Sequence, residues 1–231
     1  MTNLKKAILI VGVFLFINKS HSQNINWASL TNENKHVTNL NLNWDYASTV
    51  GIYYGCKLNT KPPIIFGIDY SVPVGSKVFD DFKSKIGIQM QLIKFQNFRL
   101  STKIQGIFRK YEQPIVRLLN FGSDFSGAFG YYKSKWFVAT EFGFDKAIVT
   151  YFKHSSRYKN SFTMVNDGWY EPATGGNFYY GLLTGISFKK HDVYLKIGKV
   201  VTQDFKTTPL IPYYAQLGYN FKINKMIRLK K

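Results

Sequence analysis

The sequence predicts an all-β chain that folds as one closed antiparallel β-barrel of about ten strands, with eight strands as the alternative. Three observations predict this fold class. Apolar residues alternate with polar or small residues through most of the chain after residue 37, and a period of two is typical of strands. Phe and Tyr are abundant, with 20 and 16 copies. Finally, the connections between predicted strands tend to alternate between short and long, as they do in an up-and-down barrel with both termini at the short-turn end.

Residues 1–22 have the composition of a signal peptide. Lys5 and Lys6 precede an apolar run over residues 7–17, and Ser20 and Ser22 place small side chains just before Gln23. The run is too short to span a bilayer as a helix, which requires about 20 residues. We therefore predict that residues 1–22 are removed on export, which lowers the formal charge of +18 by the three lysines of this segment and leaves a strongly basic chain.

The rest of the chain divides into three parts. Residues 23–36 are polar without a period, which predicts a flexible lead with no fold of its own. Residues 37–222 carry the alternation and form the predicted barrel, and residues 223–231 form a basic tail. Cys56 is the one cysteine, which excludes an intrachain disulfide and CxxC metal or redox spacing. No cluster of metal ligands is visible, and neither a metal nor a cofactor is expected. Export and the lack of a recognition motif argue against a nucleic acid partner.

Ten segments carry the alternation, taken in chain order. The boundary between the first two is the weakest, because the period continues through the turn near Ala47. Pro62 and Pro63 mark the turn before the third, and residues 111–117, 151–176 and 203–211 are predicted as loops. The predicted strands cover residues 37–46, 50–57, 64–70, 82–92, 98–109, 119–132, 136–148, 178–188, 193–198 and 213–221.

The two faces of these strands differ in a way that favours a membrane barrel over a soluble one. One face is apolar, with aromatic residues near the strand ends that resemble the girdles of barrels in lipid. The other face combines many glycines with charges of both signs, and such charges can neutralise one another across a narrow lumen. We expect Asp124, Glu141 and Asp145 to find basic partners on the preceding strand. The predicted lumenal ion network comprises Asp69, Asp124, Glu141, Asp145, Lys85, Arg99, Lys103 and Arg109.

The export signal, the amphipathic strands and the aromatic end of the last strand, Tyr219 and Phe221, resemble those of the small outer-membrane β-barrel proteins of Gram-negative bacteria. The resemblance covers essentially the whole mature chain and implies an outer-membrane location. It also implies partners, namely outer-membrane lipid, lipopolysaccharide and other envelope proteins. One departure is that such barrels often end on an aromatic residue, whereas here Lys222–Lys231 follows Phe221.

The loop over residues 151–176 is the predicted binding surface, because barrels place recognition on long loops. Its aromatic and basic residues supply contacts for a surface ligand, and the alternative interpretation is a lid that folds over the barrel mouth. The candidate binding residues are Tyr158, Trp169, Tyr170, Arg157 and Lys159.

The same loop holds the one candidate for catalysis. His154 and Ser156 are spaced to share a face of a strand, and Asp167 or Glu171 could orient the histidine, which gives the parts of an acyl hydrolase. This arrangement is similar to that of the outer-membrane lipid A deacylases, and the resemblance implies His154 as base and Ser156 as nucleophile. Of the two acids, Glu171 is the candidate for this site. Two departures weaken the resemblance, since Arg157 and Tyr158 replace small polar residues and three further strands follow instead of one.

The sequence therefore predicts a structural or surface-binding outer-membrane barrel with a largely plugged lumen and no catalysis. The first alternative is a lipid A acyl hydrolase that uses His154 and Ser156. The second is a narrow channel or a component of an envelope transport assembly.

Overall fold

The computed structural model describes residues 25–45, 47–75, 78–172 and 175–224. The predicted signal peptide and most of the basic tail lie outside these residues. Strands make up most of the described chain, and long strands follow one another with short turns. The elements are β1 (Asn34–Trp44), β2 (Ser48–Leu58), β3 (Ile64–Pro73), β4 (Asp81–Phe95), β5 (Phe98–Glu112), β6 (Val116–Tyr132), β7 (Trp136–His154), α2 (Ser156–Ser161), β8 (Gly168–Tyr170), β9 (Gly176–Phe188), β10 (His191–Thr202) and β11 (Tyr213–Asn224).

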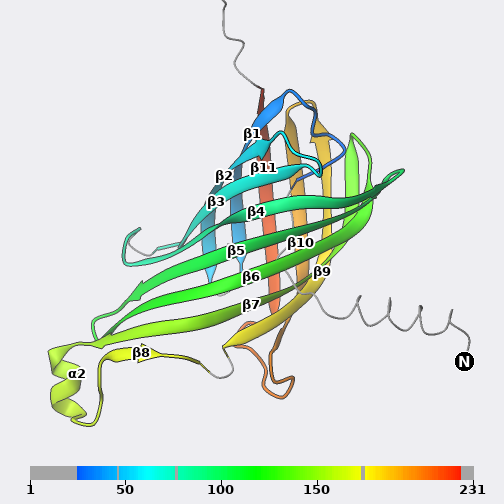
Figure 1. Ribbon diagram of the computed structural model, residues 1–231. Coiled ribbons are helices and arrows are strands. Elements are labelled where there is room, and N and C mark those ends of the chain that lie inside the picture. The colour runs from blue at the N-terminus through cyan, green and yellow to red at the C-terminus, as the bar shows by residue number, and fades with distance from the viewer. Residues whose placement is uncertain (1–24, 46, 76–77, 173–174, 225–231) are drawn as a thin grey trace, which may run out of the picture.

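The strands form a closed antiparallel barrel of ten members, as the sequence predicts. Neighbours in sequence pair from β1 through β7, β7 then pairs with β9, and β11 pairs with β1 to close the barrel. The short strand β8 lies outside this circle and pairs with β7 alone among the described strands. Figure 1 shows the barrel with the short turns at one end and with α2, β8 and the long connections at the other.

The prediction of the ten strands is confirmed, and the differences concern the long-loop end. Residues 111–117 are not a loop. β5 continues to Glu112 and β6 begins at Val116, which leaves only a tight turn over residues 113–115. The loop after residue 151 is also more ordered than expected, since it contains the end of β7, α2 and β8. Extending these ladders satisfies backbone hydrogen bonds that a loop would leave to water. Within the described ranges, no helix is long and apolar enough to cross a membrane.

The outer and inner walls of the barrel have opposite chemistry. On β1, Leu40, Leu42 and Trp44 face outward and are more than half exposed, whereas Asn39 and Asn41 at the alternate positions are 2% and 4% exposed. Apolar side chains stand outside and polar ones are buried inside, the reverse of a soluble barrel. Inward glycines make room for large lumenal rings; at Gly218, for example, an added Cβ would collide with the ring of Tyr194.

The segment before β1 is folded into the barrel, so its interpretation as a flexible lead is wrong for the described residues. Ile25, Asn26 and Trp27 are at most 4% exposed. The Asn26 side-chain amide donates to the carbonyl of Lys133 and to the Ser187 hydroxyl, both at 2.8 Å. This segment has no period because it is irregular, yet it is buried because the lumen encloses it. Ile25 and Trp27 pack with inward residues of the short-turn end, namely Val37, Ile65, Tyr132, Phe137, Ala139, Leu183 and Tyr194.

The hairpin of β6 and β7 is longer than the rest of the barrel. β7 pairs with β9 only up to Lys146, while its pairing with β6 continues to His154, so the hairpin projects past the barrel rim, as Figure 1 shows. A β-bulge interrupts this extension. Phe121 pairs with Val149 and Gly122 pairs with Ala147, so Ile148 is an extra residue in β7.

Candidate functional site

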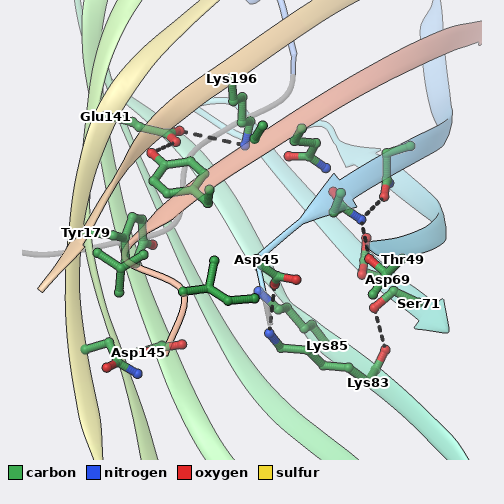
Figure 2. A pocket seen from close by; sticks show the side chains of 18 of the residues that line it. Asp45, Thr49, Asp69, Ser71, Lys83, Lys85, Glu141, Asp145, Tyr179 and Lys196 are labelled. Carbon is green, nitrogen blue, oxygen red and sulfur yellow. Dashed lines mark hydrogen bonds and ion pairs between the residues drawn. The ribbon is translucent and has the colours of Figure 1, made fainter. Parts of the chain in front are cut away.

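A polar cavity of about 300 Å³ occupies the lumen at the long-loop end. Side chains from at least seven strands line it, and the loop over residues 203–212 contributes Pro209, Leu210 and Ile211 at its mouth. Figure 2 shows Lys196 pointing toward Glu141 and Lys83 pointing toward Asp45 around this space. Its charged lining residues are Asp45, Asp69, Lys83, Lys85, Lys103, Glu141, Asp145 and Lys196.

One buried ion pair in the cavity joins β7 to β10. The Nζ atom of Lys196 lies 3.7 Å from Oε2 of Glu141, and both side chains are almost fully buried. The hydroxyl of Tyr214 on β11 donates a hydrogen bond to the other oxygen of the same carboxylate. A buried carboxylate requires such partners, because transferring an unpaired charge out of water is very costly. Glu141, Lys196 and Tyr214 thus connect three strands across the lumen.

A second ion pair joins β4 to β6. Nζ of Lys85 lies 3.0 Å from Oδ2 of Asp124, and the Asp124 side chain is 1% exposed. The hydroxyl of Tyr179 on β9 donates to the other carboxylate oxygen at 3.3 Å. At the rim, Lys83 and Asp45 form a third, more exposed pair at 3.3 Å.

All eight residues of the predicted ion network lie at inward-facing positions, but their partners differ from those expected. Asp124 and Glu141 pair with Lys85 and Lys196 rather than with bases of β5. The guanidinium of Arg99 donates to Gln91 at 2.9 Å, and that of Arg109 lies 3.7 Å from Asp81. Lys103 and Asp69 make no hydrogen bond or ion pair with another described residue, and both line the cavity together with Asp145.

One more buried ion pair, at the short-turn end, was not predicted from the sequence. Lys222 Nζ lies 2.6 Å from Asp192 Oδ1, and both side chains are fully buried. The Ser29 hydroxyl also contacts this pair, since Lys222 donates to it at 2.5 Å. The signal was present in the strand period, since Lys222 follows Gln216, Gly218 and Asn220 on the inward positions of β11, although the predicted last strand ended at residue 221.

The projecting loop separates the predicted binding residues into two groups. Trp169 packs on the outer face of the hairpin, with ring centroids 6.0 Å from Phe121 and 5.1 Å from Tyr151. Tyr170 points the other way and meets Phe152 edge-on. Consecutive residues of β8 diverge because a strand alternates its side chains. Tyr158, Arg157 and Lys159 lie on α2, which the Ser155 hydroxyl caps by accepting from the Tyr158 amide at 3.3 Å.

His154 is held by Asp167 rather than by Glu171. The Asp167 Oδ1 atom accepts from the His154 backbone at 2.8 Å and lies 3.1 Å from its Nδ1 atom, while Lys159 donates to Oδ2 at 2.5 Å. These hydrogen bonds, led by that from the His154 amide, lower the pKa of Asp167 to about 2. Glu171 is exposed. Ser156 makes no hydrogen bond with His154 among the described residues. The contacts therefore form a loop anchor rather than an assembled Ser–His pair.

Comparisons with known proteins add little to this geometry. No protein-family model matches the chain, and no curated protein matches it. One similar solved structure belongs to work described as "Unveiling the Mechanism Behind the in-meso Crystallization of Membrane Proteins". The match covers 83% of this chain and 84% of the other chain, at 6% sequence identity and a TM-score of 0.41. At that level of similarity it supports no conclusion about function.

Proposed function

We propose that this chain is an outer-membrane β-barrel protein of a Gram-negative envelope, with a lumen closed at one end and a binding role at the other. The observation that carries the proposal is the inverted chemistry of the wall: apolar side chains stand outside, while ions and amides are buried inside. Soluble monomers rarely expose contiguous apolar patches larger than a few hundred Å². Lipid is the solvent that favours this wall.

The strand lengths agree with this environment. The shortest barrel strand, β3, has 10 residues, which at a rise of about 3.3 Å per residue and a tilt of about 40° spans about 25 Å. That is the height of the apolar band in outer-membrane barrels. The short turns lie at the same end of the barrel as the start of β1 and the end of β11. This arrangement supports a periplasmic location for the short-turn end.

The packing inside the barrel favours a binding role over transport. At the short-turn end, Ile25 and Trp27 fill the lumen together with inward aromatic residues. At the opposite end the lumen is hollow, and its cavity offers lysines and carboxylates to a ligand that arrives from the cell surface. The projecting hairpin with α2 and β8 supplies a second surface on that side. We propose no catalytic step.

The membrane location is tested by fractionation and by gel migration before and after boiling. We expect the protein to sediment with the outer-membrane fraction and to be solubilised only by detergent. We also expect its gel band to migrate differently before and after boiling. Recovery as a soluble protein without detergent would refute the proposal.

The closed lumen is tested separately in planar lipid bilayers, after protease protection has shown that the protein is inserted. The expected result is no conductance step for the wild-type chain. Steady conductance would show instead that the narrow-channel alternative is correct.

A further inference from the structure

A groove of about 850 Å³ runs over the outer wall of the barrel where β7, β9, β10 and β11 meet. The strand register explains its shape. One row of outward residues crosses the wall at a single height, and its members Thr140 and Ala215 are small while the others are large. The wall is therefore hollowed beside the larger side chains. This row comprises Trp44, Ala215, Ile197, Leu182 and Thr140.

The next row toward the long-loop end carries a charge. Lys199 pairs in register with Tyr213 on one side and with Tyr180 on the other, and all three side chains are exposed on the outer wall. Lys199 makes no hydrogen bond or ion pair with any described residue of the protein. A cation thus stands between two tyrosines at the edge of an otherwise apolar groove.

The row beyond Lys199 is apolar again. Val201 pairs with Phe178, and the Phe178 ring contacts Phe144 and Phe205 at centroid distances of 4.9 and 4.8 Å. Lys199 is therefore enclosed by apolar residues toward both barrel ends. A lysine on the lipid face of a barrel destabilises it, and the cost decreases toward the interface. An anion beside the ammonium group lowers this cost, and no residue in the described part of the chain pairs with Lys199.

We propose that this groove binds a membrane lipid that carries a phosphate group, with the phosphate on Lys199 and an acyl chain along Leu182, Ile197 and Ala215. The inference rests on the proposed membrane location. Charge complementarity selects this occupant, because Lys199 is the one cation among the residues that line the groove, while the side chain of Glu141, the acid among them, is buried in the lumen. The hydroxyls of Tyr180 and Tyr213, on either side of the lysine, are suited to donate to the same phosphate.

The test is native mass spectrometry of the detergent-purified protein with added phosphatidylglycerol, and with diacylglycerol as the chain-only comparison. We expect a one-to-one adduct with phosphatidylglycerol and a weaker one with diacylglycerol. Lys199→Gln should weaken phosphatidylglycerol binding about fivefold, as expected for one lysine near an anionic headgroup. Ala215→Trp fills the groove without altering the charge and should weaken the binding of both lipids.

Lys153→Gln is the matched control, since Lys153 is an exposed lysine on β7 at the same end of the barrel. Equal losses in Lys153→Gln and Lys199→Gln would overturn the inference in favour of diffuse charge attraction. An adduct that Ala215→Trp leaves unchanged, or a dimer that it abolishes, would also overturn it. Heat-dependent gel migration is recorded for each variant. A protein that inserts normally but binds no phosphatidylglycerol refutes only the groove, whereas a protein that fails to insert refutes the proposed function.

Discussion

The two ends of the lumen differ in whether their charged side chains are paired and buried or face an open cavity. At the short-turn end, the Lys222–Asp192 pair is fully buried and contacted by Ser29, and apolar side chains pack around the neighbouring Trp27. At the long-loop end, Lys103 and Asp69 face a cavity without a direct partner among the described residues. The same barrel thus contains a packed, stabilising end and an open end that leaves charges available. This contrast is the physical basis for our proposal that one end is closed and that the other binds a ligand.

The largest difference is expected for the buried ion pairs. Lys222→Ala leaves Asp192 buried and unpaired, and we expect a loss of about 3–5 kcal/mol in the free energy of unfolding. Lys83→Ala removes the lysine of the Lys83–Asp45 pair at the other end, which is more exposed than the Lys222–Asp192 pair, and a smaller loss of about 1 kcal/mol is expected. Denaturant titrations in lipid vesicles, followed by gel migration, measure both. Equal losses would contradict the distinction between the two ends.

Two tryptophans give a second comparison. Trp27 is 4% exposed and Trp169 is 57% exposed. Trp27→Ala should cost about 3 kcal/mol, since it leaves a cavity among buried side chains, whereas Trp169→Ala should cost about 1 kcal/mol or less. The same titrations measure these values. If Trp27→Ala is as mild as Trp169→Ala, the N-terminal segment does not stabilise the barrel.

Glycines test how tightly the lumen is packed. A Cβ at Gly218 would collide with the ring of Tyr194, while a Cβ at Gly106 on the outer face would find no atom closer than 4.0 Å. We expect Gly218→Ala to destabilise the protein by about 1–3 kcal/mol through overpacking. Gly106→Ala should change stability by about 0.5 kcal/mol or less. A tolerated Gly218→Ala would mean that the interior is looser than described.

The smallest effect concerns the anchor of the projecting loop and depends on pH. The pKa of Asp167 is lowered from its ordinary value to about 2, so its hydrogen bonds to His154 and Lys159 stabilise the loop above about pH 4. This contribution is lost as the pH falls through the folded pKa of about 2. Acid-stable protease digestion should therefore cut residues 162–167 faster below pH 4. In Asp167→Asn the cutting should be fast at every pH, and an unchanged pH profile in that variant would rule out Asp167 as the anchor.

The strand period predicted the fold because it reports a local property, the alternation of side chains across a wall. Ion partners are not local. Lys85 reaches Asp124 past the intervening strand β5, and Glu141 on β7 meets Lys196 on β10. These distances depend on how the barrel closes, which the period does not specify. The N-terminal segment was missed for a related reason, since Trp27 is buried by the lumen and not by a pattern of its own.

The loop after His154 shows the other limit of the sequence. Asp167 was one of two acids proposed for His154, and the sequence analysis chose Glu171. Spacing did not distinguish them, because β8 folds back on β7 and thereby decides which carboxylate reaches the histidine. The Ser155 cap of α2 was not predicted, because the neighbouring Ser156 was interpreted as a possible nucleophile.

The bulge at Ile148 shifts the alternation of β7 by one residue. Before it, odd-numbered residues such as Glu141 and Asp145 face inward; after it, the parity changes, and Phe152 and His154 share the inner side while Tyr151 faces outward with Trp169. Deleting Ile148 would remove the bulge and leave the later side chains on their present faces, because Val149 would then follow Ala147 directly and still alternate with it. Regular pairing that kept Ile148 in the ladder would instead turn His154 to the outer face and Tyr151 to the inner one. The bulge thus decides which residues the projecting hairpin presents on each face.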